Sequence, residues 1–127
     1  MREFKFRGFD IVGGKGWVYG DLVHNKKVTT TGLEDRVMVC GYEVSPDSIG
    51  LCTNYPSCNG SLIYEGDIIK VHEGSGEYNT VVVWHKMSAG FCLKDENGGI
   101  SFLAECFPYK LESIGTIYEN PNYLKND

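Results

Sequence analysis

Cysteine and histidine are the residue types in this chain best suited to metal binding or nucleophilic chemistry. The chain has five cysteines and three histidines, and Cys52 and Cys58 lie in one stretch rich in turn-forming residues. Zinc prefers thiolate and imidazole ligands, which structural sites usually deliver as closely spaced cysteine pairs. The spacing of Cys52 and Cys58 is too wide for a zinc-binding cysteine pair of this kind. No second cysteine pair follows in the sequence. They are metal candidates without a complete ligand set, and we expect no cofactor.

The other three cysteines, Cys40, Cys92 and Cys106, lie in strand-like runs. Cysteine in such a setting usually behaves as a small buried hydrophobic residue. An odd number of cysteines without a secretory signal indicates reduced thiols. We therefore expect a cytoplasmic protein whose cysteines do not form disulfides.

The run Tyr64-Glu65-Gly66-Asp67 is the second candidate for chemistry, because it places two carboxylates on one face of a strand. A catalytic pair would need a neighbour that raises the pKa of one acid, and the sequence supplies none. In the structural interpretation, Gly66 permits an unusual backbone angle and Asp67 accepts backbone N–H groups. We favour this interpretation and treat the four residues as a structural motif.

Signatures of the common enzyme classes are absent from the sequence. It contains no nucleophile elbow, no His-Glu-x-x-His and no phosphate-binding P-loop. The glycines at 13, 14 and 16 lack the Lys-Ser or Lys-Thr that would make them a phosphate loop, so a flexible hairpin is the better interpretation. We expect no catalytic residues and a protein that is not an enzyme.

Charge and hydropathy limit the partners. The 127 residues carry a formal net charge of −5, with acidic and basic residues interspersed. Proteins that bind nucleic acid usually present a basic surface, so a nucleic-acid partner is possible but disfavoured. The first residues alternate charged and aromatic side chains, and no apolar run is long enough to cross a bilayer. We expect no membrane association.

Period-two alternation and frequent turn residues predict short β-strands through most of the chain. Asn97-Gly98 is a strong hairpin signal, and Asn25-Lys26 suggests another turn. Proline after Ser45 and after Asn120 predicts two short helical turns. The expected strands are 3–7, 17–23, 28–30, 36–44, 66–72, 80–84, 90–95, 100–103 and 111–118.

The turn-rich residues 52–61 mark the expected boundary between two parts of the chain. We predict a mainly β fold in which an N-terminal β region, residues 1–61, joins a small SH3-like β-barrel, residues 62–127, with a short C-terminal helix. The segment 62–71 would open the barrel. Closure of a barrel removes the exposed edges that short strands otherwise leave.

Four stretches resemble the YopX family of bacteriophage and prophage proteins. They are the start Met1-Arg2-Glu3-Phe4-Lys5-Phe6-Arg7, then Trp17-Val18-Tyr19-Gly20, the central Ile63-Tyr64-Glu65-Gly66-Asp67-Ile68-Ile69-Lys70-Val71, and Ile114-Gly115-Thr116-Ile117-Tyr118-Glu119-Asn120-Pro121. Gly8 and Phe9 depart from the family's usual Ala and Trp, and the loop 51–60 has changed in most positions. The resemblance implies a phage-derived protein with an SH3-like part. It supplies no catalytic residue, cofactor or substrate.

Aromatic residues make up 13% of the chain and exceed what a single small core needs. Most are better assigned to cores or to a protein interface than to a base-stacking platform, because the lysines among them are few and scattered. The expected function is a non-catalytic protein-interaction or self-assembling module. A nucleic-acid-binding barrel that acts in phage DNA or RNA metabolism is the alternative.

Overall fold

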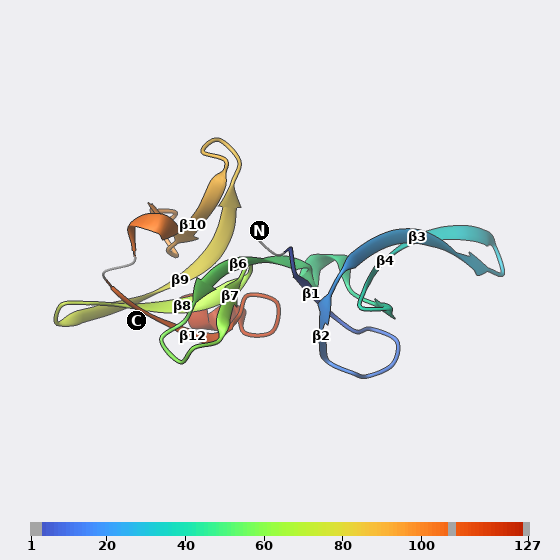
Figure 1. The fold of residues 1–127 in the computed structure, drawn as a ribbon, viewed down its shortest axis with the longest axis horizontal. Coiled ribbons are helices and arrows are strands. Elements are labelled where there is room, and N and C mark those ends of the chain that lie inside the picture. Colours follow the sequence, from blue (N-terminus) through green and yellow to red (C-terminus); the bar gives the residue numbers. More distant parts are fainter. Residues whose placement is uncertain (1–3, 107–108, 126–127) are drawn as a thin grey trace. The chain divides into compact units, whose positions relative to one another are not determined.

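The computed structural model describes residues 4–106 and 109–125 and is mainly β, with antiparallel strands and short 3₁₀ turns. The predicted fold class is thus confirmed at this level. The chain forms two compact units, residues 1–52 and 53–127, called the first and second unit below (Figure 1). The sequence-based boundary at residue 61 falls nine residues later than this division.

The strands of the first unit belong to two antiparallel sheets. Strand β1 (Phe6–Phe9) pairs with β2 (Trp17–Gly20), and its other edge pairs with the start of β6 (Gly50–Pro56). Strand β3 (Leu22–Thr29) pairs over its whole length with β4 (Gly32–Val39), which is followed by β5 (Tyr42–Glu43) and the 3₁₀ turn η1 (Pro46–Ser48). The core consists of valines at positions 18, 37, 39 and 44.

The second unit is a five-stranded antiparallel sheet with the order β11-β10-β9-β8-β12, and β6 and β7 (Leu62–Tyr64) run beside each other. Its strands are β8 (Asp67–Glu73), β9 (Gly76–His85), β10 (Gly90–Lys94), β11 (Ile100–Phe102) and β12 (Lys110–Thr116). Two 3₁₀ turns complete it, η2 (Leu103–Glu105) and η3 (Pro121–Leu124). The buried core contains Ile63, Ile69, Val71, Val82, Leu93, Leu103, Cys106 and Leu111.

Both of the predicted helical turns form, and each begins with a proline. η1 begins at Pro46 and η3 begins at Pro121, where the fixed backbone angle of proline suits the first position of a helix. Ser45 makes no side-chain cap bond to η1. The third turn, η2, has no such signal and was not expected from the sequence.

Two sequence-based expectations about turns are wrong. The chain does not turn at Asn25-Lys26, because β3 continues to Thr29 and Asn25 instead accepts a hydrogen bond of 2.7 Å from Nε of Arg36 on β4. The turn lies at residues 30–31, where the hydroxyl of Thr29 donates to the carbonyl of Gly32. Residues 52–61 are not all loop, since β6 runs to Pro56 and tolerates Asn54 at a φ of +64°.

The sequence predicts a closed or nearly closed barrel, and full closure does not occur in the part of the chain that the structure describes. The sheet order of the second unit is linear, and its edge strands β11 and β12 do not pair with each other. Strand β11 is short, with only three residues, and all three are exposed. No helix within the described ranges has the length and apolar character that a membrane span requires.

Candidate functional site: an aromatic pocket in the second unit

The structural motif Tyr64-Glu65-Gly66-Asp67 forms a tight turn between β7 and β8. Gly66 has a φ of +94°, which glycine adopts without the steric penalty of a Cβ atom. The carboxylate of Asp67 accepts a 2.8 Å hydrogen bond from the main-chain N–H of Tyr64. Both Asp67 and Tyr64 are buried. These contacts give the four residues a role in positioning the two strands.

Gly66 also connects this turn to two other strands. Its N–H donates to the carbonyl of Val82 on β9, and its carbonyl accepts from the N–H of Ile117 just after β12. Any other residue at position 66 would need a backbone φ that L residues rarely adopt. The turn therefore joins the centre of the sheet to its edge.

The two metal candidates sit in different settings. Cys52 is fully buried in the first unit, where its N–H donates to the carbonyl of Lys5. Cys58 is exposed in the second unit, where its N–H donates to the carbonyl of Leu111. Across the described residues, no group of three or more His, Cys, Asp or Glu side chains could hold a metal ion.

Two further cysteines lie in the core of the second unit. Burial raises the pKa of the Cys92 thiol and of the Cys106 thiol, and nearby Glu105 raises the pKa of Cys106 further. A nucleophilic cysteine needs the opposite shift, because the thiolate is the reactive form. Cys92 and Cys106 therefore act as core residues.

Two charged or polar clusters flank the sheet. His72 on β8 lies 3.3 Å from Glu77 and 3.1 Å from Glu112, with all three side chains partly exposed. Ion pairs with that exposure contribute little to stability.

Near η2, burial raises the pKa of Tyr78, while Glu73 is the main cause of the raised pKa of Tyr109. Both phenols therefore stay protonated at neutral pH.

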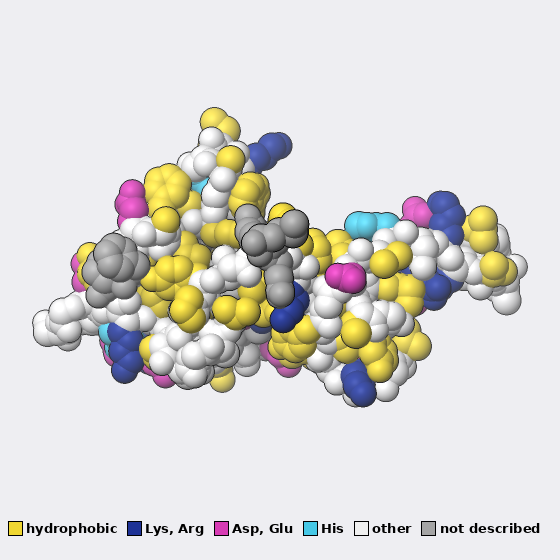
Figure 2. All heavy atoms as spheres, viewed as in Figure 1, with side chains coloured by type: hydrophobic (Ala, Val, Ile, Leu, Met, Phe, Trp, Pro, Cys, Tyr) yellow, Lys and Arg dark blue, Asp and Glu magenta, His cyan; other side chains and the backbone are white. Residues whose placement is uncertain are grey.

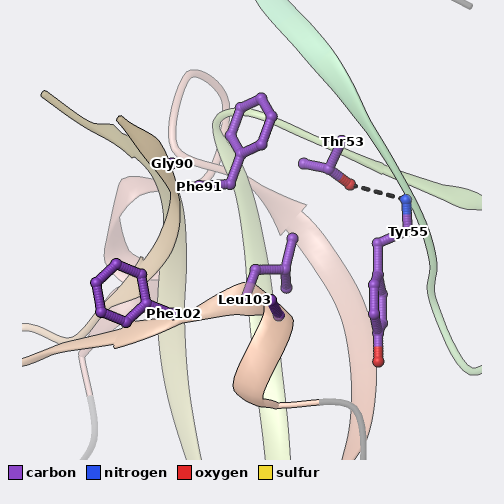
Figure 3. Close-up of a pocket in the computed structure, with 7 residues that line it drawn as sticks. Thr53, Tyr55, Gly90, Phe91, Phe102 and Leu103 are labelled. Atoms are coloured by element: carbon purple, nitrogen blue, oxygen red, sulfur yellow. Dashed lines mark hydrogen bonds between the residues drawn. The ribbon is translucent and has the colours of Figure 1, made fainter. Parts of the chain in front are cut away.

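A pocket of about 250 Å³ lies in the second unit (Figure 3). We call it the aromatic pocket. Its lining comes from β6, β10, β11 and η2, namely Thr53, Tyr55, Gly90, Phe91, Phe102, Leu103 and Ala104.

Three residues of the aromatic pocket, Leu103, Tyr55 and Phe91, are held in place by packing behind them. Leu103 belongs to the buried core, and the rings of Tyr55 and Phe91 pack against that core. The N–H of Tyr55 donates to the hydroxyl of Thr53 over 3.1 Å, as Figure 3 shows. The rings of Phe91 and of Trp84 on β9 pack edge to face, with 5.2 Å between their centroids. Phe102 is 42% exposed, so its ring faces water at the open side.

The chemistry of the aromatic pocket is that of a binding surface. Among its seven described lining residues none carries a carboxylate, an imidazole, a thiol or an amine. Burial raises the pKa of the Tyr55 hydroxyl, with a smaller contribution from Cys106, so this hydroxyl is a neutral hydrogen-bonding group. Such a lining suits an apolar side chain placed against a few polar contacts.

Sequence reasoning did not locate this pocket. It assigned most of the aromatic residues to cores or a protein interface and did not bring Tyr55, Phe91 and Phe102 together. The alternation in Ile100-Ser101-Phe102 places Ile100 and Phe102 on one face of a strand, and both are exposed. No local pattern pairs that strand with Thr53 and Tyr55.

The fold and the site define a small β protein in two units, the second of which carries an apolar aromatic pocket. The chain belongs to the YopX family: the family model, described as YopX protein, matches residues 5–125. No curated protein matches the chain. Two of the stretches that carry the resemblance form the β7–β8 turn and the end of β12, which meet at Gly66 and Ile117.

Proposed function

We propose that this protein is a non-catalytic protein-interaction module, encoded by a phage or prophage and active in the bacterial cytoplasm. It binds other protein chains, copies of itself included, through the aromatic pocket. The observation that carries the proposal is an apolar pocket whose outer wall, Phe102, is a large ring exposed to water on an edge strand. Exposed aromatic side chains beside a pocket are typical of interface anchors.

The size of the aromatic pocket favours a peptide side chain over a free small molecule. Its volume of about 250 Å³ lies below the range of roughly 300–1,000 Å³ usual for small-molecule sites. Strand β11 forms one edge of the five-stranded sheet, so its outer backbone groups can pair with an added strand. An extended peptide beside β11 can bond to this edge while one apolar side chain enters the pocket.

We propose that the second unit is a partly open SH3-like barrel. Four strands follow one another as a meander, β8 to β11, and β12 returns to pair with β8. The 3₁₀ turn η2 lies between β11 and β12. This order and this turn support the SH3-like assignment, and small barrels of that type host many functions.

A peptide display selection tests the proposal. A random peptide library is selected on the full chain, and bound peptides are then measured against Phe102→Ala and against Met87→Ala, whose side chain is 91% exposed and does not line the pocket. We expect peptides with a shared aromatic or aliphatic residue, bound at least about tenfold more weakly by Phe102→Ala. Enriched peptides that are insensitive to Phe102, or no enrichment, would contradict the proposal.

Nucleic-acid binding is the alternative function. The exposed rings of Trp84, Phe102 and Tyr109 could stack on bases. The net charge of −5 opposes phosphate binding. A gel shift with single- and double-stranded oligonucleotides at low salt separates the two functions, because phosphate binding would appear there and weaken steeply as salt rises.

A further inference from the structure

Strands β3 and β4 form a two-stranded ribbon that extends from the first unit, here called the arm (Figure 1). Strand β3 comes last in its sheet, whose order is β3-β4-β5, so among the described residues no strand pairs with its outer edge. On the other side of the arm, β5 joins only at Met38 and Val39. An isolated two-stranded ribbon is marginally stable in water. A strand added to the outer edge of β3 would therefore stabilise the arm.

The outer edge of β3 is the longest open strand edge in the part of the chain that the structure describes. Strand β3 has eight residues, and none of them is buried. The edge strands β2, β5, β7 and β11 have between two and four residues. Strand β12 has seven, but its edge is partly occupied, because the N–H of Cys58 donates to the carbonyl of Leu111. A long row of open N–H and C=O groups is a template for pairing with another strand.

The open backbone groups of β3 belong to every second residue. Just before the strand, the carbonyl of Asp21 accepts a 3.1 Å hydrogen bond from the N–H of Cys40. In an antiparallel pair, residues that bond to the neighbouring strand alternate with residues whose N–H and C=O point away from it. Because Asp21 bonds toward the β4 side, the even-numbered residues of β3 point their backbone groups outward. They are Leu22, His24, Lys26 and Val28.

The outward-pointing residues have an apolar side chain at each end of the strand. Val28, near the far end of the arm, is 84% exposed, and Figure 2 shows hydrophobic atoms at the end of this ribbon. Leu22, at the near end, is half-buried and packs against the valine core of the first unit. Even-numbered side chains of a strand share one face, so both apolar groups project from the same side of the arm.

The two lysines of β3 do not select a charged partner. Lysine on an edge strand usually opposes the addition of a second strand. Here Lys26 forms an ion pair with Asp35 on β4, and Lys27 forms one with Glu43 on β5. Both charges are thus compensated within the first unit. Recognition at this edge therefore depends on the backbone groups and on the apolar residues at its two ends.

We infer that β3 of one copy of this protein pairs antiparallel with β3 of a second copy, about a two-fold axis beside Asn25. In this register Leu22 lies opposite Val28 of the second copy, and His24 lies opposite Lys26. All of the outward N–H and C=O groups of both strands are then used, in about eight hydrogen bonds. Any other antiparallel register leaves some of these groups without a partner strand.

A second copy fits this edge because the edge is self-complementary. It presents the same eight residues, already in strand conformation, and a two-fold axis places the same surface on both sides of the contact. Each Val28 leaves water against a Leu22 that already packs on a core, and this happens twice. The edge lies in the first unit and the aromatic pocket in the second, so this inference goes beyond the proposed function and does not depend on it.

Cysteine cross-linking tests both the contact and its register. Opposite residues of a pair that shares no backbone hydrogen bonds have Cα atoms about 4.5 Å apart, which a disulfide can span. In a Cys40→Ser, Cys58→Ser background, Asn25→Cys should therefore give a disulfide-linked dimer on mild oxidation. Val23→Cys, on the same face of β3, is the matched control, because the two copies of residue 23 would lie about 13 Å apart along the strands. Linkage of neither variant, or equal linkage of both, would overturn the inference.

A second pair of variants tests the apolar ends of the edge. Val28 and Leu33 lie opposite each other and are both exposed, but only Val28 is on β3. Val28→Asp places a carboxylate against Leu22 of the second copy and should raise the half-association concentration at least about tenfold. Leu33→Asp should change it less than about threefold, because β4 lies away from the contact. Sedimentation and native mass spectrometry over a concentration series measure both.

Phe102→Ala separates this inference from the proposed function. It removes a wall of the aromatic pocket and leaves the arm unchanged, so the dimer should persist. A wild type that stays monomeric would overturn the β3 contact even if selected peptides still bind the pocket. A dimer that persists in Val28→Asp but dissociates in Phe102→Ala would place the self-contact at the pocket, which also overturns it. An intact β3 dimer together with a failed peptide selection would support the β3 contact and count against the proposed function alone.

Discussion

The main-chain N–H of Ile117 donates a 2.8 Å hydrogen bond to the carbonyl of Gly66. This bond joins the turn before β8 to the residue after β12, so two segments far apart in the sequence meet at one glycine. The N–H of Gly66 also donates a hydrogen bond, to the carbonyl of Val82. The β7–β8 turn is therefore a structural junction of the second unit.

Substitution of Gly66 by alanine should destabilise the second unit. The φ of +94° is costly for any residue with a Cβ atom, so we expect a loss of about 1–2 kcal/mol in the free energy of unfolding. Urea unfolding followed by Trp84 fluorescence in a Trp17→Phe background reports this unit. Gly76→Ala is the matched control, because its Cβ would meet only ordinary contacts. An equal loss in both variants would contradict the assigned role of Gly66.

Removal of the Asp67 carboxylate should also weaken the second unit. Asp67→Ala leaves the buried N–H of Tyr64 without its acceptor, which costs about 1–3 kcal/mol. The same Trp84 fluorescence measurement applies. Glu105→Ala, an exposed acidic position, should change the stability by less than about 0.5 kcal/mol. A loss for Asp67→Ala no larger than that of this control would argue against the hydrogen bond.

Gly8→Ala tests the packing of the first unit. A Cβ at Gly8 would lie 2.7 Å from Cβ of Val44, which is buried in the core and cannot move away freely. Overpacking of this kind should cost about 1–3 kcal/mol. Trp17 fluorescence in a Trp84→Phe background would detect the loss, while Trp84 fluorescence in a Trp17→Phe background should not change. Unchanged unfolding of the first unit would show that the core has room at this position.

Asp10 should make the stability of the first unit depend on acid pH. Hydrogen bonds from the N–H groups of Gly13, Val12 and Lys15 lower the pKa of Asp10 below its ordinary value of 3.8. A lowered pKa stabilises the fold above the ordinary value, and this stabilisation is lost as the pH falls through the folded-state pKa.

The measurement compares the wild type with Asp10→Asn. The variant should unfold at a lower temperature at pH 6, and the difference should shrink below about pH 3.8 as the carboxylate becomes protonated. Asp21→Asn, at an exposed position, is the control. A difference between wild type and Asp10→Asn that does not change with pH would contradict the charged role of Asp10.

Reaction with a thiol reagent should distinguish two classes of cysteine. Cys40 and Cys58 are exposed, whereas Cys52, Cys92 and Cys106 are buried. The thiol pKa is also raised at Cys92 and Cys106, which lowers their thiolate fraction. At neutral pH we expect two thiols to react quickly and three only on unfolding, and Cys40→Ser with Cys58→Ser should remove the fast phase. A third fast thiol would show that the core opens.

Local sequence signals predicted the elements whose structure depends on adjacent residues. Asn97-Gly98 forms the expected hairpin loop, with Gly98 at a φ of +89° and the Asp95 carboxylate accepting from Asn97 and Gly99. The prolines at 46 and 121 begin the two expected 3₁₀ turns. At Asn25 the same reasoning failed, because a cross-strand bond to Arg36 holds that residue within a strand.

The sequence by itself determined the β character of the chain, several of its turns and its membership of the YopX family. Polar–apolar alternation, glycine and proline affect the conformation of only a few neighbouring residues. Their effects can therefore be predicted from a short stretch of sequence. Only the tertiary structure decided that Thr53 and Tyr55 line one pocket together with Phe91 and Phe102, and that β11 and β12 do not pair with each other. These relationships depend on strand order and packing between distant segments, which no local spacing encodes.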